Sequence, residues 1–304
     1  MPEIPDLEGY AAYLNKRLPG VAVVEAEAPI PWMIRTGGDD FLERMKGQVF
    51  GEIGRVAKML IFPFAGNSAR LGARKGAHLG ARKGAHLGAR KGARPGDSGD
   101  FLAVHAMLTG RYQYVEPKEK RRAMTAWLLR LENGMELRYF DDRRMGRTFL
   151  VREDEFAEKI PRWTEMGPDV LDPALTEEVF VQRVSKKSGM IKNIITTESV
   201  VAGIGNAYSD EVLWEARLHP FRKRTDIPPE SIAELFHSIR RVMDWAIPIV
   251  VERTEEEGLP AKTYRDHLRV HHRPEEAVCP RDGHKITSIT SGQRETNFCR
   301  ACQE

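Results

Sequence analysis

The chain has 304 residues, 41% of them hydrophobic and 30% charged, with a formal net charge of +3. This length allows a large core divided over two or three domains, and the lack of an apolar run of about 18 residues excludes a transmembrane helix. The acidic, non-apolar N-terminus is not a signal peptide. All three cysteines lie within residues 279–302, which argues against a disulfide framework and predicts a reducing, cytoplasmic environment.

Near the N-terminus an amphipathic helix is predicted, because apolar residues recur at helical spacing from Leu7 to Leu18. Short β-type segments follow, and Asn133-Gly134 between two of them is a strong hairpin signal. Many short strands at close spacing favour a β-sandwich or barrel. We therefore expect residues 1–155 to form an N-terminal catalytic β-sandwich domain that begins with this helix.

Within that domain the octapeptide LGARKGAH or a close variant occurs three times, over residues 71–94. Residues 70–94 hold eight of the 47 basic residues and no acid, which leaves 39 bases against 44 acids elsewhere. Because this composition cannot offset its ordering entropy, we expect a disordered basic loop over residues 67–99. Counterion release would also let it tether nucleic acid, and the sequence leaves its role open.

From about residue 165 the pattern becomes helical. The longest predicted helix starts at Pro228-Pro229 and stops at Gly258. We expect a helical domain over residues 165–258 and a small basic domain over residues 261–304. The expected fold is thus an α+β multidomain protein that ends in a β-hairpin.

The cysteine-containing tail has the spacing of a zinc site. Cys299 and Cys302 form a C-x2-C pair, Cys279 supplies a third thiolate, and a tetrahedral site needs a fourth ligand. His284 is the preferred fourth ligand, since carboxylates are rarer in structural zinc sites. Asp282, at the C-x2 position after Cys279, is the alternative. We expect one structural Zn²⁺, and a zinc-free finger is the least favoured interpretation.

Three separated stretches of the sequence resemble motifs of one known family. They are MPEIPD at residues 1–6, VVAGIGNAYSDEVLWEARLHP at 200–220 and SGQRETNFCRACQ at 291–303. In this order they resemble the N-terminus, the helix–two-turn–helix signature and the zinc finger of the formamidopyrimidine-DNA glycosylase and endonuclease VIII family. VAKMLIFPF and YFDDRRMGR fall where that family has its catalytic lysine strand and its Asp-Pro-Arg-Arg-Phe-Gly loop.

The resemblance implies a bifunctional DNA glycosylase/AP lyase of base-excision repair. Such an enzyme flips an oxidised base out of double-stranded DNA, excises it and cleaves the strand by β,δ-elimination. The expected partner is damaged double-stranded DNA, and we expect a monomer without membrane association. The alternative is a non-catalytic protein that binds DNA damage or abasic sites on the same scaffold. The preferred lesion, oxidised purine or oxidised pyrimidine, stays open.

The resemblance also implies three catalytic residues: Pro2, Glu3 and Lys58. Removal of Met1 would expose the amine of Pro2, and an α-amine has a pKa of roughly 8, lower than that of lysine. Its attack on C1′ would expel the base and leave an iminium, which is an electron sink for elimination. Glu3 would serve as general acid–base. Lys58, in an apolar strand, would hold a phosphate or the base. These residues favour the enzyme over the non-catalytic alternative.

DNA contacts are implied for Asn206, Arg294 and Lys192, the last with a solvated helix face as an equally weighted alternative. The void left by a flipped base is expected to be filled by Leu108, Arg143 and Met145. Two of these three differ from the family's usual Met-Arg-Phe set.

Met107 is the alternative to Leu108 as the intercalating side chain, because the register of this segment is open by one residue.

Overall fold

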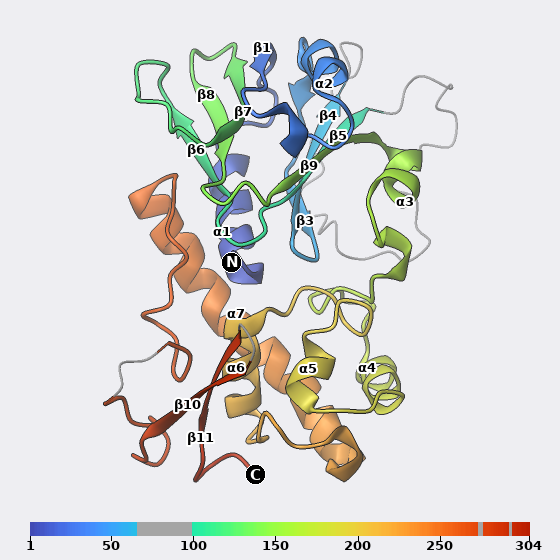
Figure 1. Ribbon diagram of the computed structural model, residues 1–304, viewed down its shortest axis with the longest axis vertical. Helices are drawn as coiled ribbons and strands as arrows, with labels where there is room; N and C mark the ends of the chain where they lie inside the picture. Colours follow the sequence, from blue (N-terminus) through green and yellow to red (C-terminus); the bar gives the residue numbers. More distant parts are fainter. Residues whose placement is uncertain (66–98, 273–275, 292–293) are drawn as a thin grey trace. The chain divides into compact units, whose positions relative to one another are not determined.

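The computed structural model describes residues 1–65, 99–272, 276–291 and 294–304 (Figure 1). It divides into two compact units: Met1–Thr164 with Val250–Thr263, and Glu165–Ile249 with Tyr264–Glu304. The basic repeat at 71–94 lies outside the described residues. The three-domain division expected from the sequence stays a prediction.

Two antiparallel sheets build the first unit and confirm the predicted sandwich. The four-stranded sheet has the order β1-β7-β8-β6, with β1 at Val23–Glu27, β6 at Arg111–Val115, β7 at Thr125–Leu131 and β8 at Glu136–Phe140. The second has the order β2-β4-β5-β9 with β3 paired to β4: β2 Val49–Phe50, β3 Gly54–Val56, β4 Met59–Ala65, β5 Asp100–His105 and β9 Arg147–Arg152.

Helix α1 (Ile4–Asn15) packs on an aromatic cluster between these strands. The ring of Tyr10 lies 5.7 Å from that of Tyr112, and Tyr112 lies 5.3 Å from Tyr139, which stacks on Trp127 at 5.6 Å. All four are buried, and burying each such side chain stabilises the fold by about 2–3 kcal/mol. The apolar face that the sequence predicted for the first helix is thus the face that packs on the core of this unit.

Two connections cross from one sheet to the other, and they position the site described below. Residues 106–110 lead from β5 to β6, and residues 141–146 lead from β8 to β9. Because β5 pairs with β9 and β6 pairs with β8, the two connections run side by side.

The β7–β8 hairpin turns at Asn133-Gly134, as expected, and Gly134 has a positive φ of 81°. The remaining elements of this unit are short: η1 Pro31–Met33, α2 Gly38–Met45, η2 Glu153–Glu155, α3 Phe156–Lys159 and η3 Trp163–Glu165, which ends at the boundary of the unit. Strand β9 and helix α2 lie outside the elements expected from the sequence; α2 has only eight residues, about two turns, which is too short to show a clear helical period.

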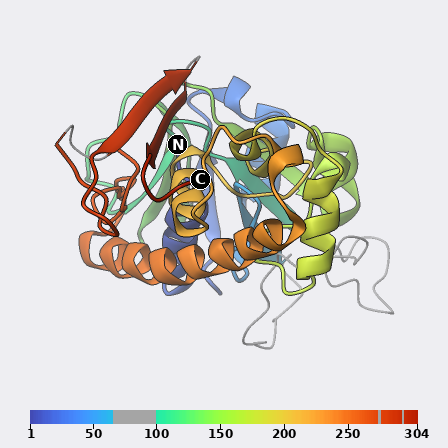
Figure 2. The ribbon, with the colours of Figure 1, turned by 90° about the horizontal axis from the view of Figure 1, so that it is seen from below.

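The second unit is mostly helical and ends in a hairpin. Its elements are α4 Glu177–Ser185, α5 Ile191–Ile195, α6 Asn206–Glu215, η4 Arg224–Asp226, α7 Pro229–Glu257, β10 Ile286–Ser291 and β11 Arg294–Cys299. Figure 2 shows α7 as one continuous helix; its last turns, from Val250, belong to the first unit. Within the described residues, no helix combines the length and apolar character needed to cross a bilayer.

Candidate functional site

The N-terminal segment is held in place at the start of α1. Pro2 and Glu3 are buried, and Glu3 is the N-cap residue of the helix. The backbone N–H of Glu3 donates to Oδ2 of Asp6 at 2.8 Å. Asp6, an acid in the first turn, therefore forms a capping-box contact at the start of the helix.

Lys58 lies in a two-residue turn, where the sequence placed it in a strand. Val56 pairs with Met59 across the turn, and Ala57 has a positive φ of 52°. Lys58 is only 9% exposed. The hairpin is fastened to α1 because Nε of Arg55 lies 2.8 Å from Oε1 of Glu8. The structure thus brings the Lys58 turn to the helix whose N-cap residue is Glu3.

A histidine that sequence reasoning missed lies beside Lys58. His105 pairs with Met59 on one side and with Arg147 on the other. Burial, and then the positive charges of Lys58 and Arg147, lower the pKa of His105 to about 4. Nδ1 accepts from the N–H of Met107 at 3.1 Å, so the neutral ring presents Nε2–H as a donor. The available signal was a lone histidine in an apolar strand.

The two crossing turns bring together the residues expected to fill the DNA void. Leu108 is 39% and Met145 40% exposed, which is unusual for large apolar side chains, and Arg143 is also exposed. The N–H of Arg143 donates across the turns to Oγ1 of Thr109 at 3.3 Å. Met107 is more buried than Leu108 and its N–H is bound to His105, which favours Leu108 as the outward residue.

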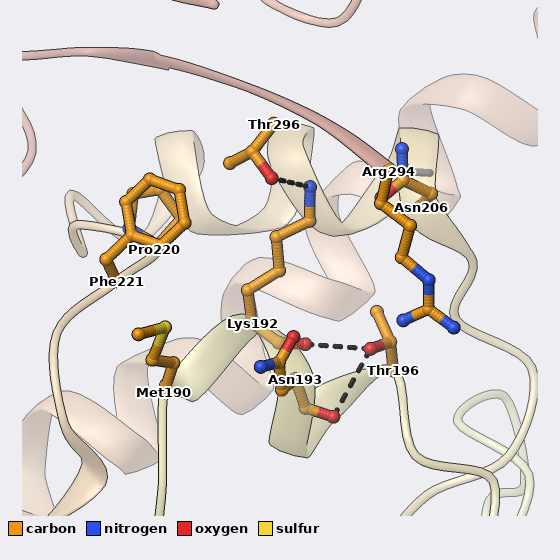
Figure 3. Close-up of a pocket in the computed structure, with 9 residues that line it drawn as sticks. All are labelled: Met190, Lys192, Asn193, Thr196, Asn206, Pro220, Phe221, Arg294 and Thr296. Atoms are coloured by element: carbon orange, nitrogen blue, oxygen red, sulfur yellow. Dashed lines mark hydrogen bonds between the residues drawn. The ribbon is translucent and has the colours of Figure 1, made fainter. Parts of the chain in front are cut away.

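In the second unit, a pocket of about 200 Å³ gathers all three expected DNA-contacting residues (Figure 3). Its lining comprises Met190, Lys192, Asn193, Thr196, Asn206, Pro220, Phe221, Arg294 and Thr296. Arg294, the first residue of β11, is exposed. Nδ2 of Asn206 donates to the carbonyl of Glu295 at 2.9 Å, while its Oδ1 is buried without a partner among the described residues.

Lys192 does not lie on a solvated helix face, the alternative that the sequence left open, because its side chain is only 7% exposed. Nζ lies 2.5 Å from Oδ1 of Asp210 and donates to Oγ1 of Thr296 at 2.9 Å (Figure 3 shows the second bond). The other oxygen of Asp210 accepts from Nδ1 of His271 at 2.7 Å and from the N–H of Asn297 at 3.0 Å. This buried network joins α5 and α6 to β11. A DNA contact by Lys192 stays a prediction.

A group of metal-ligating side chains lies at the base of the β10–β11 hairpin. Its members are Cys279, Asp282, Cys299 and Cys302, whose ligand atoms all lie within 4.8 Å of one another. The sulfurs of Cys279 and Cys302 are 3.8 Å apart, and Oδ2 of Asp282 is 3.3 Å from Sγ of Cys299. Zinc–sulfur bonds of about 2.3 Å in a tetrahedron separate sulfurs by about 3.8 Å, so the geometry fits zinc.

The surroundings shift the ionisation of these ligands in both directions. The backbone N–H of His284 is the first of several hydrogen bonds that hold the pKa of Asp282 at about 2. Burial raises the pKa of Cys302 to about 12. Nε1 of Trp214 donates to Sγ of Cys279 at 3.3 Å, and Nη1 of Arg281 donates to Sγ of Cys302 at 3.4 Å. Both donors favour thiolates.

His284, the expected fourth ligand, lies outside this group, and the alternative Asp282 takes its place. The ring of His284 is 67% exposed, and its Nδ1 lies 3.4 Å from Oδ1 of Asp282. The described geometry therefore favours Asp282 over His284, and the identity of the fourth ligand stays a prediction. The tight turn closed by Gly283 N–H to the carbonyl of Cys279 at 2.8 Å places position 282 beside the sulfurs and leaves position 284 beyond them.

Both units match known protein families. Residues 1–148 match the family model described as the formamidopyrimidine-DNA glycosylase N-terminal domain, and residues 166–255 match the formamidopyrimidine-DNA glycosylase H2TH domain. The formamidopyrimidine-DNA glycosylase of Herpetosiphon aurantiacus is 36% identical over 217 residues, covering 68% of this chain and 76% of that protein. That of Pelotomaculum thermopropionicum is 28% identical over 308 residues, covering 100% and 99%.

Solved structures resemble the chain over its full length. The Lactococcus lactis formamidopyrimidine-DNA glycosylase bound non-covalently to DNA containing an AP site has a TM-score of 0.78, 25% identity and 100% coverage of both chains. A complex of the Lactococcus lactis protein with DNA containing Fapy-dG has the same TM-score and identity and covers 99% of this chain and 100% of that one.

Proposed function

Because the chain belongs to the formamidopyrimidine-DNA glycosylase family, we propose that it is a bifunctional DNA glycosylase/AP lyase that excises oxidised bases in base-excision repair. The observation that carries this proposal is the N-terminal segment: Pro2 and Glu3 stand buried at the start of α1, and the hairpin with Lys58 is fastened to the same helix. Relatives bound to DNA with an AP site or Fapy-dG support the choice of substrate.

In the proposed reaction, the amine of Pro2 forms a bond to C1′ of the damaged nucleotide as the glycosidic bond breaks, and the base leaves with a proton. The C1′–O4′ bond then opens as O4′ takes a proton, which gives an iminium. The iminium acidifies the sugar C2′ proton, and loss of that proton expels the 3′ phosphate and breaks the strand. Glu3 takes and returns protons during ring opening and elimination. Lys58 and the Nε2–H of neutral His105 supply adjacent donors for a phosphate or an opened sugar, and His105 is an addition to the catalytic set of Pro2, Glu3 and Lys58.

Binding uses a different group of residues on each unit. On the first, Leu108, Arg143 and Met145 project from the crossing turns and fill the void of the flipped base. On the second, Arg294 and Asn206 hold phosphates at the pocket.

Lys192 is proposed to support the Arg294 strand from the pocket lining, because its amine is bound by Asp210 and Thr296. A direct contact between Lys192 and DNA stays a prediction.

The metal of the finger is proposed to be one structural Zn²⁺ held by Cys279, Asp282, Cys299 and Cys302. Zinc would neutralise the thiolates and fix the base of the β10–β11 hairpin, on which Arg294 stands. The mixed thiolate–carboxylate donor set and the sulfur separation of 3.8 Å support this identity.

The test of the proposed function is covalent trapping. With borohydride present, the wild-type protein should form a covalent complex with abasic-site duplex DNA, and an N-terminal extension, which removes the free amine of Pro2, should lower the trapping rate by about 100-fold or more. Asp142→Ala, an exposed substitution away from the N-terminus, is the matched control. Trapping by the extended protein at the wild-type rate would reject Pro2 as nucleophile, and a wild type that neither traps nor cleaves would reject the enzyme.

A further inference from the structure

The two crossing turns, residues 106–110 and 141–146, carry the residues expected to fill the void. No strand pairing joins one turn to the other. They are bounded by strand pairs at both ends: His105 pairs with Arg147 in one sheet, and Arg111 pairs with Phe140 in the other. Between these ends, residues 106–110 and 141–146 cross the sandwich. Their relative placement must therefore come from side chains.

The side chain of Asp141 joins them. It is fully buried. Oδ1 accepts from Oγ1 of Thr109 in the first turn and from the N–H of Arg143 at 3.2 Å in the second. Oδ2 accepts from the N–H groups of Met145 at 2.8 Å and Gly146 at 2.6 Å. Since a carboxylate offers about four lone-pair sites, this set of donors saturates it.

The hydroxyl of Tyr139 is a second group that contacts both turns. The hydroxyl of Tyr139 is buried between Gly110 and Gly146, and a Cβ on either glycine would overlap it. At Gly110 a Cβ would also lie 2.6 Å from the carbonyl of Ala106. Burial, and then the charge of Asp141, raise the pKa of Tyr139, so its phenol stays neutral. One turn therefore cannot shift without displacing the other.

We propose that Asp141 is a positioning residue that locks the two turns into one rigid platform, so that Leu108, Arg143 and Met145 keep a fixed spacing before DNA is bound. The inference rests on the proposed function, because it assigns these three side chains to the DNA void. Preorganisation matters here because ordering loops on binding lowers affinity. Asp141 itself does not touch DNA in this proposal and acts through the three side chains.

The experiment compares two probes. The first is a duplex with a tetrahydrofuran abasic analogue opposite 2-aminopurine, whose affinity and fluorescence report filling of the void. The second is a single-stranded abasic oligonucleotide trapped with borohydride, which needs the amine but has no void. Variants are Asp141→Ala, the milder Thr109→Val, and Asp142→Ala as the exposed control in the same turn.

Asp141→Ala should weaken duplex binding by about tenfold or more, remove the fluorescence change, and lower single-strand trapping much less. Thr109→Val should shift both duplex readouts in the same direction by a smaller factor. Adding Leu108→Ala and Met145→Ala to Asp141→Ala should cost little more, since the platform is already lost.

The inference would be overturned if Asp141→Ala weakened duplex binding and single-strand trapping by the same factor. It would also be overturned if the effects of Asp141→Ala, Leu108→Ala and Met145→Ala were fully additive, or if Asp141→Ala and Thr109→Val both bound the duplex like the wild type. If Asp141→Ala does not fold, Thr109→Val decides by the same criterion. Failure of the wild type to trap single-stranded abasic DNA is a separate outcome that would reject the proposed function.

Discussion

Lys192 is the residue whose burial the sequence did not show: it lies in the short, mostly isoleucine helix α5, and its side chain is buried beside Asp210. Replacing it with methionine leaves the carboxylate of Asp210 in the core without its cation. We expect Lys192→Met to lower the free energy of unfolding by about 3 kcal/mol, measured by urea denaturation. Lys186→Met, an exposed control, should change it by less than about 0.5 kcal/mol. Equal stability of the two variants would contradict the buried-network interpretation.

A second residue, His105, predicts a pH dependence. Folding lowers its pKa from 6.5 to about 4, so below pH 6.5 the unfolded chain binds a proton that the folded protein does not. The contribution of neutral His105 to the free energy of unfolding is complete above pH 6.5. It falls as the pH drops from 6.5 toward 4, and it does not change further below pH 4. We expect the stability difference between wild type and His105→Gln to fall by about 2 kcal/mol from pH 7 to pH 5.

Taking the difference between the two proteins removes the effects of all other titrating groups, including the metal ligands. A difference that does not change between pH 7 and pH 5, measured by urea denaturation, would contradict the lowered pKa.

At the scale of elements, we expect the β10–β11 hairpin to depend on the proposed zinc. Its base packs only a small apolar cluster, in which Trp214, Val270 and Ile286 surround the cysteines. Asp282→Ala should therefore reduce zinc content by at least about tenfold and release the hairpin, whereas Asp282→Cys should retain it. Zinc is measured by mass spectrometry on protein purified without chelator. His284→Ala, the control, should keep near-stoichiometric zinc, and the reverse result would restore His284 as the ligand.

The whole molecule carries its net charge of +3 unevenly, because the residues outside the basic repeat are mildly acidic. The strands on either side of the repeat, β4 and β5, are hydrogen-bonded neighbours. Replacing residues 67–98 with a short turn should therefore keep the fold and stabilise it by about 1–2 kcal/mol through a smaller loop-closure entropy. The slope of the logarithm of the DNA-binding constant against the logarithm of salt concentration should become less steep by about 0.9 for each phosphate that the repeat neutralised. A variant that does not fold would contradict this.

From the sequence by itself, the elements with strong local signals could be predicted. Helix α1 follows from apolar spacing, the β7–β8 hairpin from Asn133-Gly134, and the metal group from the spacing of the thiols. These signals are local because backbone geometry and ligand spacing act over a few residues. The candidate residues Pro2 and Lys58 came from the resemblance to a family, and their catalytic roles stay proposals.

Only the tertiary structure decided the contacts made over long sequence separations. The choice between Asp282 and His284 depends on how one turn folds against Cys299. The burial of Lys192 depends on Thr296, and the lowered pKa of His105 depends on Lys58 and Arg147. A periodic pattern shows which face of an element is apolar, but it does not show which distant polar group meets it, because that is decided by how the elements pack.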